Sequence, residues 1–160
     1  MSAATTRPLV PSYRTMNALS DDEIATVLER NGVGVLAIDG DSAPYQVPLC
    51  FGYVPVEDLF VLQLTGGEES KKKRHLQENQ RVSVTVYEET EPDERWRSVL
   101  VSGVLAECSY QDAERGFAAL ANNSQSIPNP ISWADSPAQA ELTPYQLDIE
   151  TRSGREFDLR

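Results

Sequence analysis

The sequence predicts a mainly β protein folded as a barrel. Three observations support this fold class: six or seven segments alternate apolar and polar residues as strands do, helical segments are few, and no helix follows each strand. The chain has 160 residues, of which 40% are hydrophobic, so it is long enough to bury one core. We therefore expect one domain over residues 19–160, preceded by an arm over residues 1–18.

The elements can be placed in order along the chain. Ser20 and Glu23 fit a capping box, which predicts a helix that ends at Asn31 and Gly32. Two further helices are expected over residues 69–79 and 110–122, the last with Ala113, Phe117 and Leu120 on its apolar face. The predicted strands cover residues 33–39, 44–54, 59–65, 81–89, 96–109 and a C-terminal stretch over 143–159.

Proline and glycine mark expected irregularities in these strands. Pro48 predicts a bulge or an unpaired edge, because proline cannot donate to a sheet ladder. Gly103 predicts a bend or bulge. Ser153 and Gly154 are expected to form a turn that divides the C-terminal stretch. Residues 121–140 are rich in Asn, Ser and Pro and predict a long loop, a type of segment that often carries function.

Charge and composition exclude several classes of function. The formal net charge is −11, which disfavours nucleic acid and anionic membranes as partners. No apolar run reaches 18 residues and the N-terminus does not resemble a secretory signal, so we expect a cytoplasmic protein. Two distant cysteines do not indicate a disulfide framework. The acidity, with only three lysines, suggests a halophilic source.

The residue groups that usually carry catalysis are missing from the sequence. It holds one histidine, His75, so a histidine-based metal site is not expected, and it lacks the glycine-rich loops of nucleotide-binding folds. The many carboxylates fall in loops and helix starts and are interpreted as a solvated surface. This pattern favours binding, or chemistry carried by a cofactor, over acid–base catalysis by side chains.

The stretch GGEESKKKRHLQEN, residues 66–79, holds all three lysines of the chain. Two glycines allow a tight turn after a strand, and a helix start offers free N–H groups to an anion. Lys71 and Lys72 would lie in the first turn, where cations are unfavourable unless an anion is present. The segment therefore predicts a phosphate site. The alternative is a solvated helix face on which Glu68, Glu69 and Glu78 pair with the lysines.

The order of these motifs resembles the pyridoxamine 5'-phosphate oxidase-like flavoproteins, the FMN-binding split barrels. The strand PYQVPLCFGY is followed by LFVLQLT, SKKKRHLQENQRVSVTVY and WRSVLVSG, and the similarity covers residues 16–110. Ser70, Lys71, Lys72, Leu76 and Asn79 fall on the family pattern. The chain lacks the basic residues that flank the second strand in the true oxidase and is more similar to the short, nitroimidazole-reductase-like branch.

The resemblance implies a six-stranded split β-barrel with a few short helices, which forms a homodimer and binds FMN between subunits. Carried over by position, the cofactor-binding residues would be Gln46, Val47, Pro48, Leu49, Thr65, Ser70, Lys71, Lys72, Arg97 and Ser98. Plainer interpretations remain for four of them: Val47 and Leu49 as core, Thr65 as a turn residue, and Arg97 as a surface charge paired with Glu94.

Three functions remain open from the sequence. The first is an FMN-dependent oxidoreductase acting on an unidentified small-molecule substrate or electron donor. The second is a non-catalytic protein of the same fold that binds flavin, a deazaflavin or haem. The third is an interaction domain without a cofactor. In each case Lys73 and Arg74 are expected to be solvated helix charges, and His75 is expected to face solvent.

Overall fold

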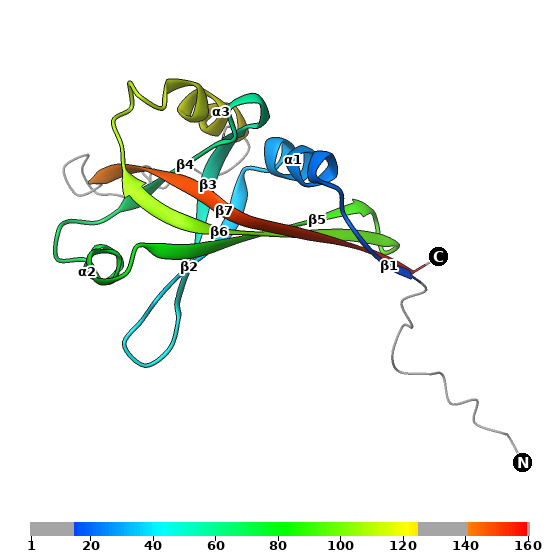
Figure 1. The fold of residues 1–160 in the computed structure, drawn as a ribbon, viewed down its shortest axis with the longest axis horizontal. Coiled ribbons are helices and arrows are strands. Elements are labelled where there is room, and N and C mark those ends of the chain that lie inside the picture. The colour runs from blue at the N-terminus through cyan, green and yellow to red at the C-terminus, as the bar shows by residue number, and fades with distance from the viewer. Residues whose placement is uncertain (1–14, 125–140, 160) are drawn as a thin grey trace, which may run out of the picture.

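The computed structural model describes residues 15–124 and 141–159, which form one antiparallel sheet with helices at its ends and on one side (Figure 1). The strands are β1 (Thr15–Ala18), β2 (Val33–Ile38), β3 (Tyr45–Val54), β4 (Leu59–Thr65), β5 (Arg81–Glu91), β6 (Arg95–Glu107) and β7 (Leu142–Asp158). The helices are α1 (Asp21–Arg30), α2 (Lys71–Glu78) and α3 (Glu114–Ser124), with a short 3-10 turn η1 (Pro55–Glu57).

The strand order closes the sheet into a barrel. Hydrogen-bonded neighbours run β1-β7-β4-β3-β2-β5-β6, and β6 also pairs with β7. Strands β2 to β7 therefore form a closed six-stranded barrel, while β1 adds to one end of β7. The predicted barrel is confirmed. Four residues of the expected N-terminal arm form β1 and join the sheet beside β7, and residues 1–14 lie outside the described part of the chain.

The barrel interior holds the main hydrophobic core. Strand residues that alternate along the chain point inward, as in the burial pattern of β5, and pack with the apolar stripe of α1. The fully buried side chains include Phe51, Phe60, Leu28, Leu36, Ile38, Leu62, Leu105 and Leu147. Rings of Phe51 and Phe60 stack at 4.7 Å between centroids. A second, smaller cluster of Leu59, Val61 and Ala113 lies under α3 on the outside of β4.

The predicted N-terminal helix is confirmed together with its cap. Ser20 N donates to Glu23 Oε2 at 2.8 Å, and Glu23 N donates to Ser20 Oγ at 3.2 Å, which completes the capping box. Helix α3 starts at Glu114, later than expected, and extends to Ser124. The remainder of the predicted loop, residues 125–140 with Trp133, lies outside the described residues.

One predicted turn is wrong. Ser153 and Gly154 lie inside β7, which runs for 17 residues and pairs with β6 along most of its length. A β carbon on Gly154 would stand 2.8 Å from Leu19 Cδ1 and 3.0 Å from Ile24 Cγ1. The glycine therefore allows α1 and the residue before it to pack closely on a continuous strand, and it does not reverse the chain.

Both other irregularities occur where expected. The β6–β7 register shifts between Ser102 and Gly103, so the bulge is confirmed. Pro48 pairs with Val35 of β2, but the β3–β4 register includes only Phe51–Val54, so Pro48 has a strand partner on one side only. In the described parts of the chain, no helix combines the length and apolarity that a membrane crossing requires.

Candidate functional site

Strands β3 and β4 part from each other at one end of the barrel. They pair over residues 51–54 and 59–62, whereas residues 45–50 of β3 and 63–65 of β4 have no partner in each other. We call this the β3–β4 opening. Helix α2 follows β4 directly and packs Leu76 into the core there, with Tyr45 and Val47 of β3 nearby. The predicted residues on β3 and those around α2 thus flank one opening.

The start of α2 provides backbone donors. Ser70 is the N-cap, and its Oγ accepts from Lys73 N at 3.3 Å. Gly66 adopts φ +115, a conformation that favours glycine, in the turn that leads from β4 to this cap. The N–H groups of Lys71 and Lys72 precede the first intrahelical bond and have no acceptor within the helix. Donors and helix dipole together favour an anion at this position.

Lys72 is the side chain that converges on this helix start. It is half-buried, and its Nζ donates to Thr65 Oγ1 at the end of β4 at 3.2 Å. Burial, together with the positive charge of Lys73, lowers the pKa of Lys72 below its ordinary value. Within residues 15–124 and 141–159, no carboxylate forms an ion pair with it. The Lys72 charge is therefore partly desolvated, with no counterion among the residues that the structure describes. Lys71, by contrast, is exposed.

Two predictions about α2 are wrong. Lys73 was expected in solvent but is 6% exposed, and its Nζ lies 3.8 Å from Glu68 Oε1. His75 was also expected in solvent but is 5% exposed, with its ring 6.0 Å from that of Tyr45. Helix α2 packs Leu76 into the core, and the side chains of Lys73 and His75, on either side of Leu76, are buried with it. Arg74 is exposed, as predicted.

The predicted residues on β3 divide between two faces. Leu49 is buried in the core and Val47 packs against it, in agreement with their plainer interpretation. Gln46 and Pro48 are exposed and point outward. Gln46 also lines a recess of about 480 Å³ with residues of β2, β5, β6 and β7, among them Ala37, Ser83, Ser102 and Thr151. That volume lies in the range of small-molecule sites.

Arg97 and Ser98 lie far from Lys72 within one chain. They pair with Glu156 and Arg155 of β7, at the end where β1 also pairs, whereas Leu105 of β6 bonds to Gln80 beside α2. The eight-residue separation along β6 corresponds to roughly 26 Å at ~3.3 Å per residue. Figure 1 shows α2 and β1 at opposite ends of the long β6–β7 ribbon.

The Arg97 guanidinium is engaged in an ion pair. Its Nε donates to Glu156 Oε2 at 2.7 Å, so its carboxylate partner in the structure is Glu156 and not the Glu94 considered from the sequence. Neighbouring Arg95 pairs with Glu91, Glu156 and Asp158. Ser98, next along the strand, points to the opposite side of the sheet. Arg97 therefore belongs to an ionic cluster between β5, β6 and β7.

The outside of β2, β5 and β6 carries exposed apolar side chains. Val33, Val35, Tyr87 and Leu100 are 44%, 40%, 69% and 44% exposed. Val35 pairs with Thr85, and Thr85 with Leu100, so these residues share one face, which we call the outer face. A recess of about 600 Å³ beside α1 and α3 is lined by Val33, Val35, Thr85, Tyr87 and Asn123. This face continues to the recess at Gln46 through Ala37 and Ser83.

Comparison with solved structures places this architecture among known folds. A FAD-binding protein of Mesorhizobium loti aligns with a TM-score of 0.66 and 29% identity, covering 88% of this chain and 97% of that one. A candidate 5-nitroimidazole antibiotic resistance protein of Bacteroides thetaiotaomicron aligns with a TM-score of 0.64 and 19% identity, covering 91% of this chain and 90% of that one. A FAD- and haem-binding protein of Mycobacterium smegmatis aligns with a TM-score of 0.59 and 22% identity, covering 89% of this chain and 73% of that one. No curated protein matches the chain.

The sequence itself matches the family model of pyridoxamine 5'-phosphate oxidase over residues 20–156. That range includes strands β2 to β6, helices α1 to α3 and most of β7. The closed six-stranded barrel and the β3–β4 opening agree with the split barrel that the sequence motifs implied. The chain is a member of the pyridoxamine 5'-phosphate oxidase family.

Proposed function

We propose that this chain binds FMN, with the phosphate at the start of α2. The observation that carries the proposal is the half-buried Lys72, which reaches Thr65 without a carboxylate partner among the described residues. A phosphate at this position would receive the Lys72 ammonium, the Lys71 and Lys72 N–H groups and the Thr65 hydroxyl. The 29% identity to a FAD-binding protein supports a flavin as the ligand.

The isoalloxazine ring would extend along the outward side of β3, past Gln46 and Pro48. These side chains flank the same opening as Lys72, and Gln46 borders a recess of suitable volume. Val47 and Leu49 point inward, so only their backbone groups could meet the ring. In an oxidoreductase of this design the flavin would accept and donate electrons, while the protein residues bind and orient it.

A second copy of this chain is the partner that we propose. The outer face exposes Val33, Val35, Tyr87 and Leu100, which suits an apolar interface between copies. Ser98 pairs with Tyr87 and so lies on this face. A partner could therefore bring its Ser98 toward the flavin, although the Ser98 of the same chain lies far from Lys72. Arg97 points to the other side and pairs with Glu156, which makes it a weaker candidate.

The Lys72→Ala variant tests the phosphate assignment. Flavin-free protein is titrated with FMN, and binding is followed by quenching of flavin fluorescence. Loss of one half-buried charged hydrogen bond should weaken FMN binding roughly tenfold to hundredfold, while binding of riboflavin, which has no phosphate, should not change. Arg74→Ala removes an exposed charge from the same helix and is the matched control. Equal FMN affinity in the wild type and Lys72→Ala would reject the assignment.

The chromophore of the purified protein separates the alternatives. Flavin absorbance with release of FMN supports the proposal. Release of FAD would support the phosphate site at α2 but show that the bound flavin is the larger FAD. A Soret band would indicate haem. Haem is less consistent with the structure because the sole histidine, His75, is buried against Tyr45. Protein that takes up no flavin at all would overturn the proposed function.

A further inference from the structure

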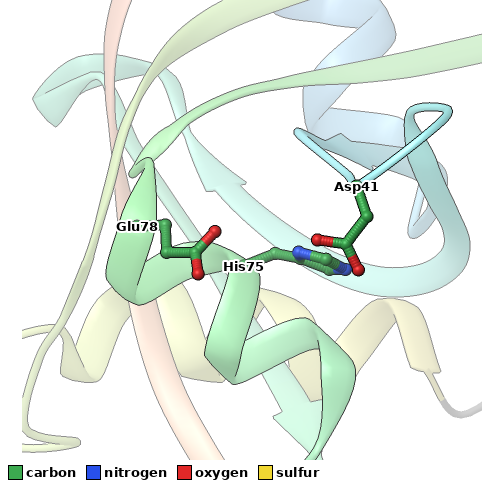
Figure 2. A group of neighbouring side chains, drawn as sticks. All are labelled: Asp41, His75 and Glu78. Atoms are coloured by element: carbon green, nitrogen blue, oxygen red, sulfur yellow. The ribbon is translucent and has the colours of Figure 1, made fainter.

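Three potential metal ligands converge at the C-terminal end of α2. Asp41 comes from the β2–β3 connection, and His75 and Glu78 come from α2. One ligand atom from each residue lies within 4.8 Å of the other two. Figure 2 shows the His75 imidazole directed toward the Asp41 carboxylate, with the Glu78 carboxylate turned toward the same ring. We propose that these three side chains bind one divalent transition-metal ion such as Zn²⁺.

His75 is the fixed ligand of this cluster. It is 5% exposed, and its ring lies 6.0 Å from that of Tyr45 at an interplanar angle of 43°. Across residues 15–124 and 141–159, neither ring nitrogen has a hydrogen-bond partner. Among the described residues, Arg95 Nε is the one buried side-chain nitrogen or oxygen without a hydrogen-bond partner, so the unpaired His75 nitrogens must be accessible from outside. An imidazole that is buried against Tyr45, has accessible nitrogens and faces two carboxylates is well suited to ligate a metal.

The two carboxylates are placed by independent structural features. Glu78 lies three residues after His75, so both side chains project from one face of α2. Asp41 is positioned by its loop, because Asn79 Nδ2 donates to Asp39 Oδ2 at 3.2 Å and Gly40 N donates to Asp39 Oδ1 at 3.1 Å. Asn79 thereby holds the loop against the end of the same helix.

Metal binding requires only small side-chain movements. Ligand atoms about 2.1 Å from a tetrahedral Zn²⁺ stand roughly 3.4 Å apart, whereas the present atoms lie within 4.8 Å. Asp41 and Glu78 are both exposed and can rotate inward. Asp41 now pairs with Arg74 at 3.6 Å, but both partners are more than half exposed, and such surface pairs contribute little. The net charge of −11 also favours a cation.

The donor set indicates the class of ion. An imidazole nitrogen favours Zn²⁺, Ni²⁺, Cu²⁺ or Fe²⁺ over Mg²⁺ and Ca²⁺, which prefer oxygen ligands alone. Three protein ligands leave at least one position for water, as in zinc sites that are not purely structural. The site lies at the opposite end of α2 from Ser70 and Lys72, and its ligands take no part in the proposed flavin site. The inference therefore stands independently of flavin binding.

Calorimetric titration with Zn²⁺ tests the proposal. Protein treated with a chelator, both with and without flavin, should bind one Zn²⁺ per chain. Asp41→Asn and Glu78→Gln each remove one ligand at an exposed position, so the fold should persist, and each should weaken Zn²⁺ binding by at least about tenfold. Glu29→Gln is the matched control, because Glu29 is also an exposed carboxylate in the last turn of a helix.

Cobalt gives a second measurement that does not depend on affinity. Co²⁺ bound through nitrogen and oxygen should give visible d–d absorbance in the wild type and in Glu29→Gln. His75→Gln should lose that absorbance while it keeps a cooperative thermal transition. Absence of Zn²⁺ binding in the wild type, or equal affinity in Asp41→Asn, Glu78→Gln and the wild type, would overturn the proposal.

Discussion

Tyr53 occupies an unusual position for a phenol, because its hydroxyl lies at the rim of the core beside an ion pair. The hydroxyl donates to Asp58 Oδ1 at 2.7 Å, and Asp58 is held by both terminal nitrogens of Arg152 at 3.0 and 2.6 Å. Asp58 itself adopts φ 49, in the left-handed region. This bidentate pair joins the turn after η1 to the middle of β7, and Tyr53 supports it from β3.

The pKa values of Tyr53 and Tyr145 make these contacts visible in a titration. Burial, followed by the nearby carboxylates Asp58 and Glu107 respectively, raises the pKa of each phenol to about 12. An unfolded tyrosine titrates near ~10. Because the folded-state pKa is raised, both phenols contribute stability that is complete below about pH 10 and is lost as the pH rises through about 12.

Alkaline titration followed by phenolate absorbance should therefore show a late step near pH 12 that coincides with the onset of unfolding. Tyr53→Phe combined with Tyr145→Phe should remove that step and flatten the pH dependence of the free energy of unfolding between pH 10 and 12. A late step of unchanged amplitude in the double variant would contradict this assignment.

Among the elements, β7 is the one on which the closed barrel depends. Its first six residues pair with β4, its last four pair with β1, and β6 lines its other edge. The β6–β7 register shifts beside Gly103 of β6, close to the point where the pairing of β7 with β4 ends. A β carbon on Gly103 would lie 1.8 Å from the carbonyl oxygen of Asp148, so only glycine fits without a backbone shift.

We expect Gly103→Ala to destabilise the protein by more than about 2 kcal/mol, because the clash is with backbone and the bulge must deform. Gly67→Ala is the matched control, since its β carbon would meet only the flexible Glu141 carboxylate at 3.2 Å. Chemical denaturation of both variants measures the difference. Similar midpoints for the two would show that the bulge does not require glycine.

Elements with strong local signals could be predicted from the sequence. The Ser20 and Glu23 cap defines the start of α1, and alternation defines β5 and most of β6. The turn predicted at Ser153 and Gly154 was wrong because local propensity there is overridden by pairing with β6 and by packing against Leu19. Such long-range contacts leave no local pattern.

In the candidate site, too, local sequence signals predict some features, whereas others depend on long-range contacts. The lysine segment predicts an anion site at Ser70, Lys71 and Lys72, but the burial of Lys73 and His75 depends on how α2 packs against the barrel. Helix α2 has only eight residues, with Leu76 as its single buried apolar side chain, so its periodicity does not define an inward face. A histidine-based metal site was not expected from the sequence, because Asp41 comes close to His75 and Glu78 only through the fold.

At the scale of the whole molecule, polar and apolar surfaces are distributed unevenly. A chain with a net charge of −11 is expected to keep copies apart by repulsion. The outer face of β2, β5 and β6 nevertheless exposes valine, tyrosine and leucine side chains next to one another. The proposed interface between copies would cover this face and leave the acidic surface in solvent.

Leu100→Glu tests that arrangement, because it would place a charge from each copy within the proposed interface. Light scattering during gel filtration should report a dimer for the wild type and a monomer for the variant. Val56→Glu changes an exposed valine in η1, away from the outer face, and should remain dimeric. A monomeric wild type would reject the proposed interface.

The dependence of the barrel on β7 has a consequence for biosynthesis. Thr15 pairs with Asp158, and Phe60 pairs with Leu147, so until β7 has been made β1 has no strand neighbour and β4 lacks one on one edge. While the ribosome is still adding residues 142–158, the nascent chain must carry an open sheet with unpaired edges. Such edges promote association between chains, and non-local pairing slows folding. Newly made molecules should therefore depend on chaperones until β7 emerges and closes the barrel.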